Sequence, residues 1–256
     1  AKVEIKEINS KIANPHSIDE LLNILKKAEK QLIDTHKSID SVPYNGLSES
    51  YMERIYINSE GANRHMKLTQ SSIYLYAKSE EEKKKPRSAG GIRINSDLEE
   101  LDIDSCIKET SEKLISHLNY KSIETNKYLI CFTPEAFLQL ISGFSSMFNA
   151  RSIIDGLSLM NEESIGDQIA VPNLNISDEG LHPENVGAFS FDGEGTPTQN
   201  INLITNGVLT HLLHSEATAR KFGVEPTGHA GLGAKVSVSP DWLVVSKSEA
   251  VKDKDE

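Results

Sequence analysis

The sequence predicts an α+β protein of two domains, with N-terminal helices packed on an antiparallel sheet and a largely β C-terminal domain containing one buried helix. Three observations predict this class. Two stretches with helical apolar spacing flank alternating apolar and polar segments in the first half of the chain. The second half opens with a strongly apolar helical stretch, and short apolar runs separated by turn residues follow it. The polar stretch between the halves, Asn119–Lys127, places the predicted domains at residues 1–122 and 123–256.

The first predicted helix starts at a capping box. In Ser17-Ile-Asp-Glu20 the serine side chain can accept from the backbone N–H of Glu20, and the glutamate can reach back. The helix is expected to run to about Lys37, with its apolar residues on one face: Leu21, Leu22, Leu25, Ala28, Leu32 and Ile33. Ahead of it, Ala1–Lys6 is charged and strand-like, unlike a signal peptide.

Strands are expected next. Met52–Asn58 and Met66–Ala77 alternate apolar and polar residues and predict two antiparallel strands. Arg87–Arg93 predicts a third strand, weakened by two glycines. Ile103–Leu118 then predicts an amphipathic helix, whose apolar face consists of Cys106, Ile107, Leu114, Ile115 and Leu118.

The second half is expected to begin with a short buried strand, Tyr128–Phe132, that would make Cys131 inert. Thr133-Pro134-Glu135 follows, with an N-cap residue, a proline at the first helical position and an acid in the first turn. The helix predicted from Thr133 to Phe148 is apolar on most sides, so we expect it to be buried.

Turn-rich sequence from Ile169 onward predicts short strands. Asn206-Gly207 lies between two apolar runs, which is the strongest short-range signal for a β-hairpin because both residues accept positive φ. A short helix is predicted over Ser215–Phe222, ended by Gly223.

Composition limits the function classes. The 256-residue chain is 38% hydrophobic and 25% charged, as a globular protein is, and it has no apolar run long enough for a transmembrane helix. Two cysteines imply no disulfide framework, which favours a cytoplasmic location. The net charge of −11 disfavours direct nucleic-acid binding.

The candidate site combines two motifs, Asp192-Gly193-Glu194-Gly195 and Thr227-Gly228-His229. Asp192 and Glu194 could form an acid–base pair, but carboxylates in turns commonly accept from nearby backbone N–H groups. We therefore expect Asp192, Glu194 and Gly195 to be architectural. Thr227, Gly228 and His229 could support a binding groove, with a structural turn as the simpler interpretation.

Histidines do not predict a metal site. His211 and His214 are the only close pair, and in the strand that we expect there they would point to opposite faces. No nucleophile is spaced to work with a histidine, so no catalytic residue is assigned.

Four segments carry a family resemblance: Phe191–Thr198, Asn206–Leu209, Thr218–Gly223 and Thr227–Ala230. In this order they resemble the TldD/PmbA family, the "modulator of DNA gyrase" proteins, and within it the PmbA/TldE-like branch. The resemblance extends from Tyr128 to about Gly231, and Asn58–Gly61 supports it in the first half.

The resemblance has a consequence for metal binding. The TldD branch carries a His-Glu-x-x-x-His zinc motif on the helix that corresponds to Thr133–Phe148. Here that helix reads Pro134-Glu-Ala-Phe-Leu-Gln-Leu-Ile-Ser-Gly143 and has no histidine. We therefore expect no cofactor in this chain, and zinc on a TldD-like partner.

The resemblance implies a non-zinc subunit of a bacterial cytosolic metalloprotease complex. Such a subunit would pair with a TldD-like chain, or with itself, and act on unfolded or precursor peptides without membrane or nucleic-acid contact. One alternative is a non-proteolytic protein that modulates DNA gyrase or another partner; a second is an autonomous hydrolase that uses its own acids and His229. Relatives have further N-terminal structure and a longer C-terminal domain, so both ends of this chain are expected to be incomplete.

Overall fold

The structure is a computed structural model that describes residues 12–247. The chain forms two compact units that do not follow a single cut in the sequence. Of the described residues, one unit contains those up to Glu53 and then Lys67–Tyr128; the other contains Arg54–Met66 and the chain from Leu129 onward. The strand-like expectation for Ala1–Lys6 lies outside the described residues. Among those residues, no helix is long and apolar enough to cross a membrane.

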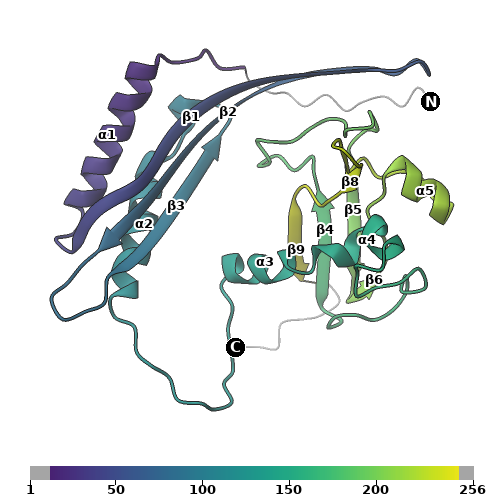
Figure 1. The fold of residues 1–256 in the computed structure, drawn as a ribbon. Helices are drawn as coiled ribbons and strands as arrows, with labels where there is room; N and C mark the ends of the chain where they lie inside the picture. Colours follow the sequence, from purple (N-terminus) through teal and green to yellow (C-terminus); the bar gives the residue numbers. More distant parts are fainter. Residues whose placement is uncertain (1–11, 248–256) are drawn as a thin grey trace. The chain divides into compact units, whose positions relative to one another are not determined.

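The unit built around the first half is an antiparallel sheet with two helices on one face (Figure 1). Its sheet has the order β1-β2-β3, formed by β1 (Ile39–Ile57), β2 (Asn63–Ser79) and β3 (Arg87–Asn95). Helix α1 (Ile18–Asp34) precedes the sheet, and η1 (Leu98–Glu100) and α2 (Ile103–His117) follow it. Both helices and all three strands were predicted, although β1 begins well before Met52.

The early start of β1 was missed because Pro43 and Gly46 are strand breakers in sequence terms. Pro43 is tolerated because β1 is an edge strand, where a missing N–H breaks no inner ladder. Gly46 is required because the ring of Tyr74 on β2 occupies the space that a Cβ would take.

The core of this unit lies between the helices and the sheet. The Ser17–Glu20 capping box is confirmed, and it starts α1 so that Ala28 and Leu32 are buried. Helix α2 contributes the predicted face, with Cys106, Ile107 and Leu114 buried. The sheet completes the core from its inward positions: Ile39, Val42, Ile73, Leu75, Ala77 and Ala89.

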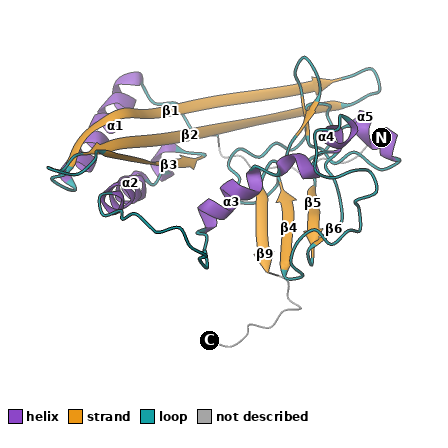
Figure 2. Ribbon diagram, turned by 60° about the horizontal axis from the view of Figure 1, so that its bottom comes forward, coloured by secondary structure: helices purple, strands orange, loops and turns teal. Residues whose placement is uncertain are grey.

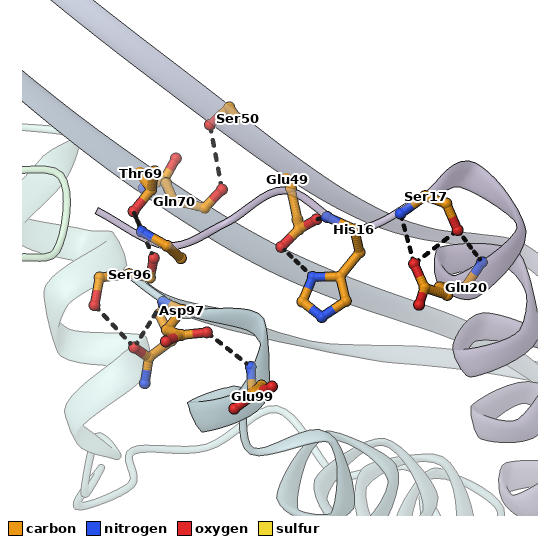
Figure 3. A network of polar contacts seen from close by, with 12 residues as sticks. His16, Ser17, Glu20, Glu49, Ser50, Thr69, Gln70, Ser96, Asp97 and Glu99 are labelled. Atoms are coloured by element: carbon orange, nitrogen blue, oxygen red, sulfur yellow. Dashed lines mark hydrogen bonds and ion pairs between the residues drawn. The ribbon is translucent and has the colours of Figure 1, made fainter. Parts of the chain in front are cut away.

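A polar network fixes the segment before α1 to the same sheet (Figure 3). The backbone N–H of His16 donates to Glu49 Oε2 at 2.8 Å, and His16 Nδ1 lies 3.0 Å from Glu49 Oε1. Ala13 N–H donates to Thr69 Oγ1, whose hydroxyl donates to the carbonyl of Ser96. The hydrogen bond between the His16 imidazole and the Glu49 carboxylate raises the pKa of His16.

The second unit is built on a four-stranded antiparallel sheet of order β6-β5-β4-β9 (Figure 2). Its strands are β4 (Leu174–Glu179), β5 (Asn200–Thr205), β6 (Val208–Leu209) and β9 (Leu243–Lys247). A two-stranded ladder joins β7 (Ala230–Gly231) to β8 (Ser237–Val238). The unit also contains four helical segments: α3 (Pro134–Ser142), η2 (Ser145–Phe148), α4 (Ala150–Ile154) and α5 (Glu216–Phe222).

Two local predictions in this unit are confirmed. Asn206 and Gly207 have φ of 51° and 79° and connect β5 to β6 as a hairpin. Helix α5 ends at Gly223, whose φ of 68° provides the left-handed C-cap. The mixed α+β class with antiparallel sheets is therefore confirmed.

Two expectations at the start of this unit are wrong. Tyr128–Phe132 is not a strand, because no described strand pairs with it, and Cys131 is exposed. The helix predicted to be buried breaks at Gly143 into α3 and η2, and no residue of α3 is buried. Ile141 packs against the core, but Leu138, Leu140 and Phe144 are exposed, since no described element covers that side.

Candidate functional site

The acidic turn is organised around the carboxylate of Asp192. Asp192 Oδ1 accepts hydrogen bonds from the backbone N–H groups of Glu194 and Thr196, each at 2.9 Å. The N–H of Asp192 donates to the carbonyl of Thr196 and closes the turn. Gly195 has a φ of 79°, a conformation that side chains rarely adopt. The carboxylate thus serves as the acceptor for N–H groups that have no backbone acceptor in the turn.

The second oxygen of Asp192 links this turn to the other predicted motif. Asp192 Oδ2 accepts from the N–H of Ala230 at 2.9 Å, and the N–H of Gly193 donates to the carbonyl of Ala230. Burial raises the pKa of Asp192, and the three N–H donors partly oppose that rise. The carboxylate therefore holds two distant segments together through their backbones.

Glu194 binds a different element. Its Oε2 accepts from the backbone N–H of Glu216 at 2.8 Å, at the first residue of α5. N–H groups in the first turn of a helix lack partners within the helix, so an acceptor there stabilises the helix start. Ser215 and Thr218 add a capping box at the same end.

Thr227, Gly228 and His229 lie in the interior of this unit. Thr227 Oγ1 accepts from the N–H of His214 at 2.8 Å and lies 3.0 Å from His229 Nδ1. Gly228 has a φ of 77°, and a Cβ there would collide with the backbone of Pro197. The structure therefore brings the two predicted motifs together, with Gly228 against Pro197 and Thr198 directly after the acidic turn.

Asp178 is a member of this cluster that was not predicted. Its Oδ2 lies 3.2 Å from His229 Nε2, and both side chains are 0% exposed. The two atoms do not form a hydrogen bond with each other. They form an ion pair only when the imidazole of His229 is protonated. Asp178 Oδ1 accepts from the N–H of Trp242 at 2.7 Å, and Oδ2 accepts from that of Asp241 at 2.9 Å. One sequence signal existed: Asp178 follows buried Ile176 at the alternate position of β4, so an acid faces the core.

The end of the β1–β2 hairpin also belongs to this unit and was not predicted to reach the acidic turn. Arg54 Nη1 donates to the carbonyl of Phe191 at 3.4 Å, and its guanidinium lies 4.0 Å from the centre of the Phe189 ring. Arg64 Nε donates to the carbonyl of Gly195 at 3.5 Å. The ring of Tyr56 fills the space beside Gly195. The turn is therefore held from both strands of the hairpin.

Metal ligands do not assemble in the described part of the chain. No group of three or more His, Cys, Asp or Glu side chains there could hold a metal ion. The strand expected at His211 and His214 is not formed, because β6 ends at Leu209. His211 is exposed and bonds to the carbonyl of Asn202, whereas His214 is buried. On α3, Glu135 is exposed near the N-terminus and has no histidine neighbour on the helix. These residues do not fit zinc.

The arrangement favours precise backbone positioning over acid–base chemistry. The oxygens of Asp192 and Asp178 accept from backbone N–H groups, and Thr227 and His229 are buried. A pocket of about 180 Å³ opens beside the acidic turn, lined by Arg54, Ile55, Tyr56, Phe191, Asp192, Gly193, Ala230, Gly231 and Leu232.

Known proteins resemble this chain along its described length. The model of the PmbA/TldA metallopeptidase central domain matches residues 12–118, and that of the PmbA/TldA metallopeptidase C-terminal domain matches residues 125–256. A metalloprotease of Methanothermobacter thermautotrophicus is 31% identical over 79% of this chain and 46% of its own length. The metalloprotease PmbA of Escherichia coli O157:H7 is 24% identical over 84% of this chain and 48% of its own length.

A solved structure agrees with these matches. A proposed modulator of a DNA gyrase from Thermotoga maritima superposes with a TM-score of 0.84 at 27% identity, covering 94% of this chain and 55% of its own. The chain spans about half the length of the curated relatives that it matches. The C-terminal domain model alone covers more than half of the chain. The chain belongs to the TldD/PmbA family of metallopeptidase-like proteins.

Proposed function

We propose that this chain is the PmbA/TldE-like, non-zinc subunit of a cytosolic peptidase complex that acts on unfolded or precursor peptides. The observation that carries the proposal is the chemistry of α3. The family is described as metallopeptidases, yet Pro134–Ser142 offers no histidine, and a zinc site needs three protein ligands or more. Zinc would then be held by a TldD-like partner.

The contribution of this chain would be to bind and orient peptide. Extended peptides bind sheet edges through main-chain hydrogen bonds. Strand β9 lies at one edge of the four-stranded sheet, and the short β7–β8 ladder adjoins the acidic turn. The buried carboxylates of Asp178 and Asp192 hold the backbones around that ladder in fixed positions.

The test is co-purification with a TldD-like subunit, followed by elemental analysis of each chain. We expect about one zinc per partner chain and none held tightly by this chain. Cleavage of an unfolded peptide should require both chains and should be lost with a chelator. One tightly held zinc in this chain alone would refute the proposal, and His211, His214 and His229 would then be the first ligands to replace.

A measurement of peptidase activity with this chain alone tests a further alternative, an autonomous hydrolase. If it cleaves unfolded peptides without a partner and resists a chelator, it is an autonomous hydrolase. A His229→Gln variant, compared with His211→Gln as an exposed control, would then show whether the buried histidine takes part.

A non-proteolytic function is favoured by one observation, the similarity to a protein described as a proposed DNA gyrase modulator. The net charge of −11 on the present chain makes contact with a protein more favourable than contact with DNA. A pull-down from a native host that recovers gyrase subunits but no TldD-like chain would support this second function.

A further inference from the structure

The pocket beside the acidic turn contains one cation among mainly apolar and backbone groups. Arg54, Ile55 and Tyr56 come from the end of the hairpin, and Gly193 and Gly231 expose backbone. Ile55 and Leu232 are 61% and 71% exposed, so large apolar side chains stand at the pocket with most of their surface in solvent. Such side chains are suited to cover an apolar group that enters from solvent.

The guanidinium of Arg54 is fixed in place but not neutralised by a direct partner. Its face lies on the Phe189 ring, and one N–H donates to the carbonyl of Phe191. A guanidinium has five N–H donors in one plane, so further donors remain for a ligand. Among the described residues, no carboxylate lies within ion-pair distance of Arg54, whereas Arg93 and Arg151 each have one.

Asp192 also lines the pocket, and its charge would oppose an anion. Three backbone N–H groups already donate to its two oxygens, from Glu194, Thr196 and Ala230. These donors disperse the negative charge toward the backbone. Arg54 is therefore the charged group of this pocket that can still bind an anionic ligand.

Size limits what can enter. A cavity of roughly 150 Å³ accepts benzene, so a pocket of about 180 Å³ has room for one branched or aromatic side chain but not for a folded domain. Guanidinium groups bind carboxylates well because their parallel N–H donors match the two oxygens.

We propose that this pocket binds the carboxylate-bearing end of an extended peptide, with the adjoining apolar side chain between Ile55 and Leu232 and the carboxylate on Arg54. The carboxylate is either the free C-terminus or an Asp or Glu side chain. This inference rests on the proposed function, because it names the class of peptide that the subunit would take.

Fluorescence anisotropy with the full chain tests the inference. One dye-labelled Gly/Ser peptide ends in Phe with a free carboxylate, the second is its C-terminal amide, and the third is the amide with a Glu before the Phe. A hydrogen bond to a charged group contributes about 1.5–3 kcal/mol, so the free acid should bind roughly tenfold or more tightly than the amide. Equal binding of all three peptides overturns the inference and leaves peptide binding itself intact. Binding of none overturns both the inference and the peptide contact in the proposed function.

Variants assign the effect to the pocket. Arg54→Gln should remove the preference for a carboxylate, and Arg54→Lys should retain part of it. Arg64→Gln is the matched control, since Arg64 also donates to a carbonyl of the acidic turn but does not line the pocket. Circular dichroism and urea midpoints confirm that each variant is folded. If the Glu peptide binds as tightly as the free acid and both affinities depend on Arg54, the pocket also binds a side-chain carboxylate. A preference that survives in folded Arg54→Gln refutes the assignment.

Discussion

His229 Nε2 and Asp178 Oδ2 lie 3.2 Å apart with both side chains completely buried. Asp178 at the same time accepts from two backbone N–H groups at the start of the segment that leads into β9. One carboxylate thus connects β4, the Thr227–His229 turn and the approach to β9.

Replacing Asp178 should therefore destabilise this unit strongly. Asp178→Ala leaves the N–H groups of Asp241 and Trp242 without their acceptor and removes the carboxylate beside the buried imidazole, which is expected to cost about 3 kcal/mol or more. Urea unfolding measures the loss. Asp155→Ala is the control, because Asp155 forms an exposed pair with Arg151 that contributes only about 0.3–0.5 kcal/mol. Equal losses in the two variants would contradict the importance of the buried cluster.

Acid should destabilise the protein through His214. Burial lowers the pKa of His214 to about 4, so the folded state keeps this imidazole neutral while the unfolded state binds a proton below about pH 6.5. Protons therefore favour unfolding between pH 6.5 and 4, and this residue should remove up to about 3 kcal/mol of stability across that range.

The measurement compares the free energy of unfolding at several pH values in wild type and His214→Gln. The difference between the two proteins should change with pH in this window, because glutamine does not titrate. His211→Gln is the control variant, because His211 lies in the same segment but is exposed. An unchanged pH dependence in His214→Gln would show that the buried imidazole is not responsible.

Gly195 should be sensitive for two separable reasons. Its φ of 79° is strained for a side chain, and Tyr56 occupies the space where a Cβ would lie. Gly195→Val is expected to cost about 1–3 kcal/mol from backbone strain, with a further loss from displacing Tyr56. Gly166→Val measures the cost of backbone strain alone, since Gly166 has a φ of 97° and nothing lies within 4 Å of where its Cβ would be.

Chemical denaturation should rank Gly195→Val below Gly166→Val in stability. Introducing Tyr56→Ala should remove the difference between the two valine variants. If the difference persists without the tyrosine ring, the contact between the hairpin and the turn does not explain the requirement for glycine.

The segment between the predicted domains should be the first site of proteolysis. Residues 119–132 are exposed and contain no helix or strand. Chymotrypsin prefers aromatic residues, and it can choose among Tyr120, Tyr128 and Phe132 in this segment and Phe137 and Phe144 in the helical region that follows. We expect first cuts at the three aromatic residues of the segment, mapped by mass spectrometry. First cuts inside Thr133–Phe148 would count against a boundary at 122/123.

Local chemistry made much of this fold predictable. The Ser17–Glu20 capping box, the Asn206-Gly207 hairpin and the glycine that ends α5 each depend on residues within a few positions of one another. The absence of a histidine on α3 is likewise legible from the sequence.

Contacts between distant residues were not predictable in this way. Nothing near His229 in the sequence indicates Asp178, and nothing near Gly195 indicates Tyr56 or Arg64. The apolar side chains of α3 gave the opposite error, because periodicity reports that a helix has an apolar face but not that an element packs against it.

Glu194 provides the sharpest test of architecture against catalysis. Glu194→Gln removes the charge but keeps an oxygen that can accept from the N–H of Glu216, so the loss of stability should stay at about 1 kcal/mol or less. Peptide cleavage by the complex reconstituted with a TldD-like subunit should be unchanged within a few-fold, as for Glu163→Gln at an exposed control position. A roughly thousandfold fall in kcat, with folding and subunit pairing intact, would instead mean that Glu194 takes part in the chemistry across the interface.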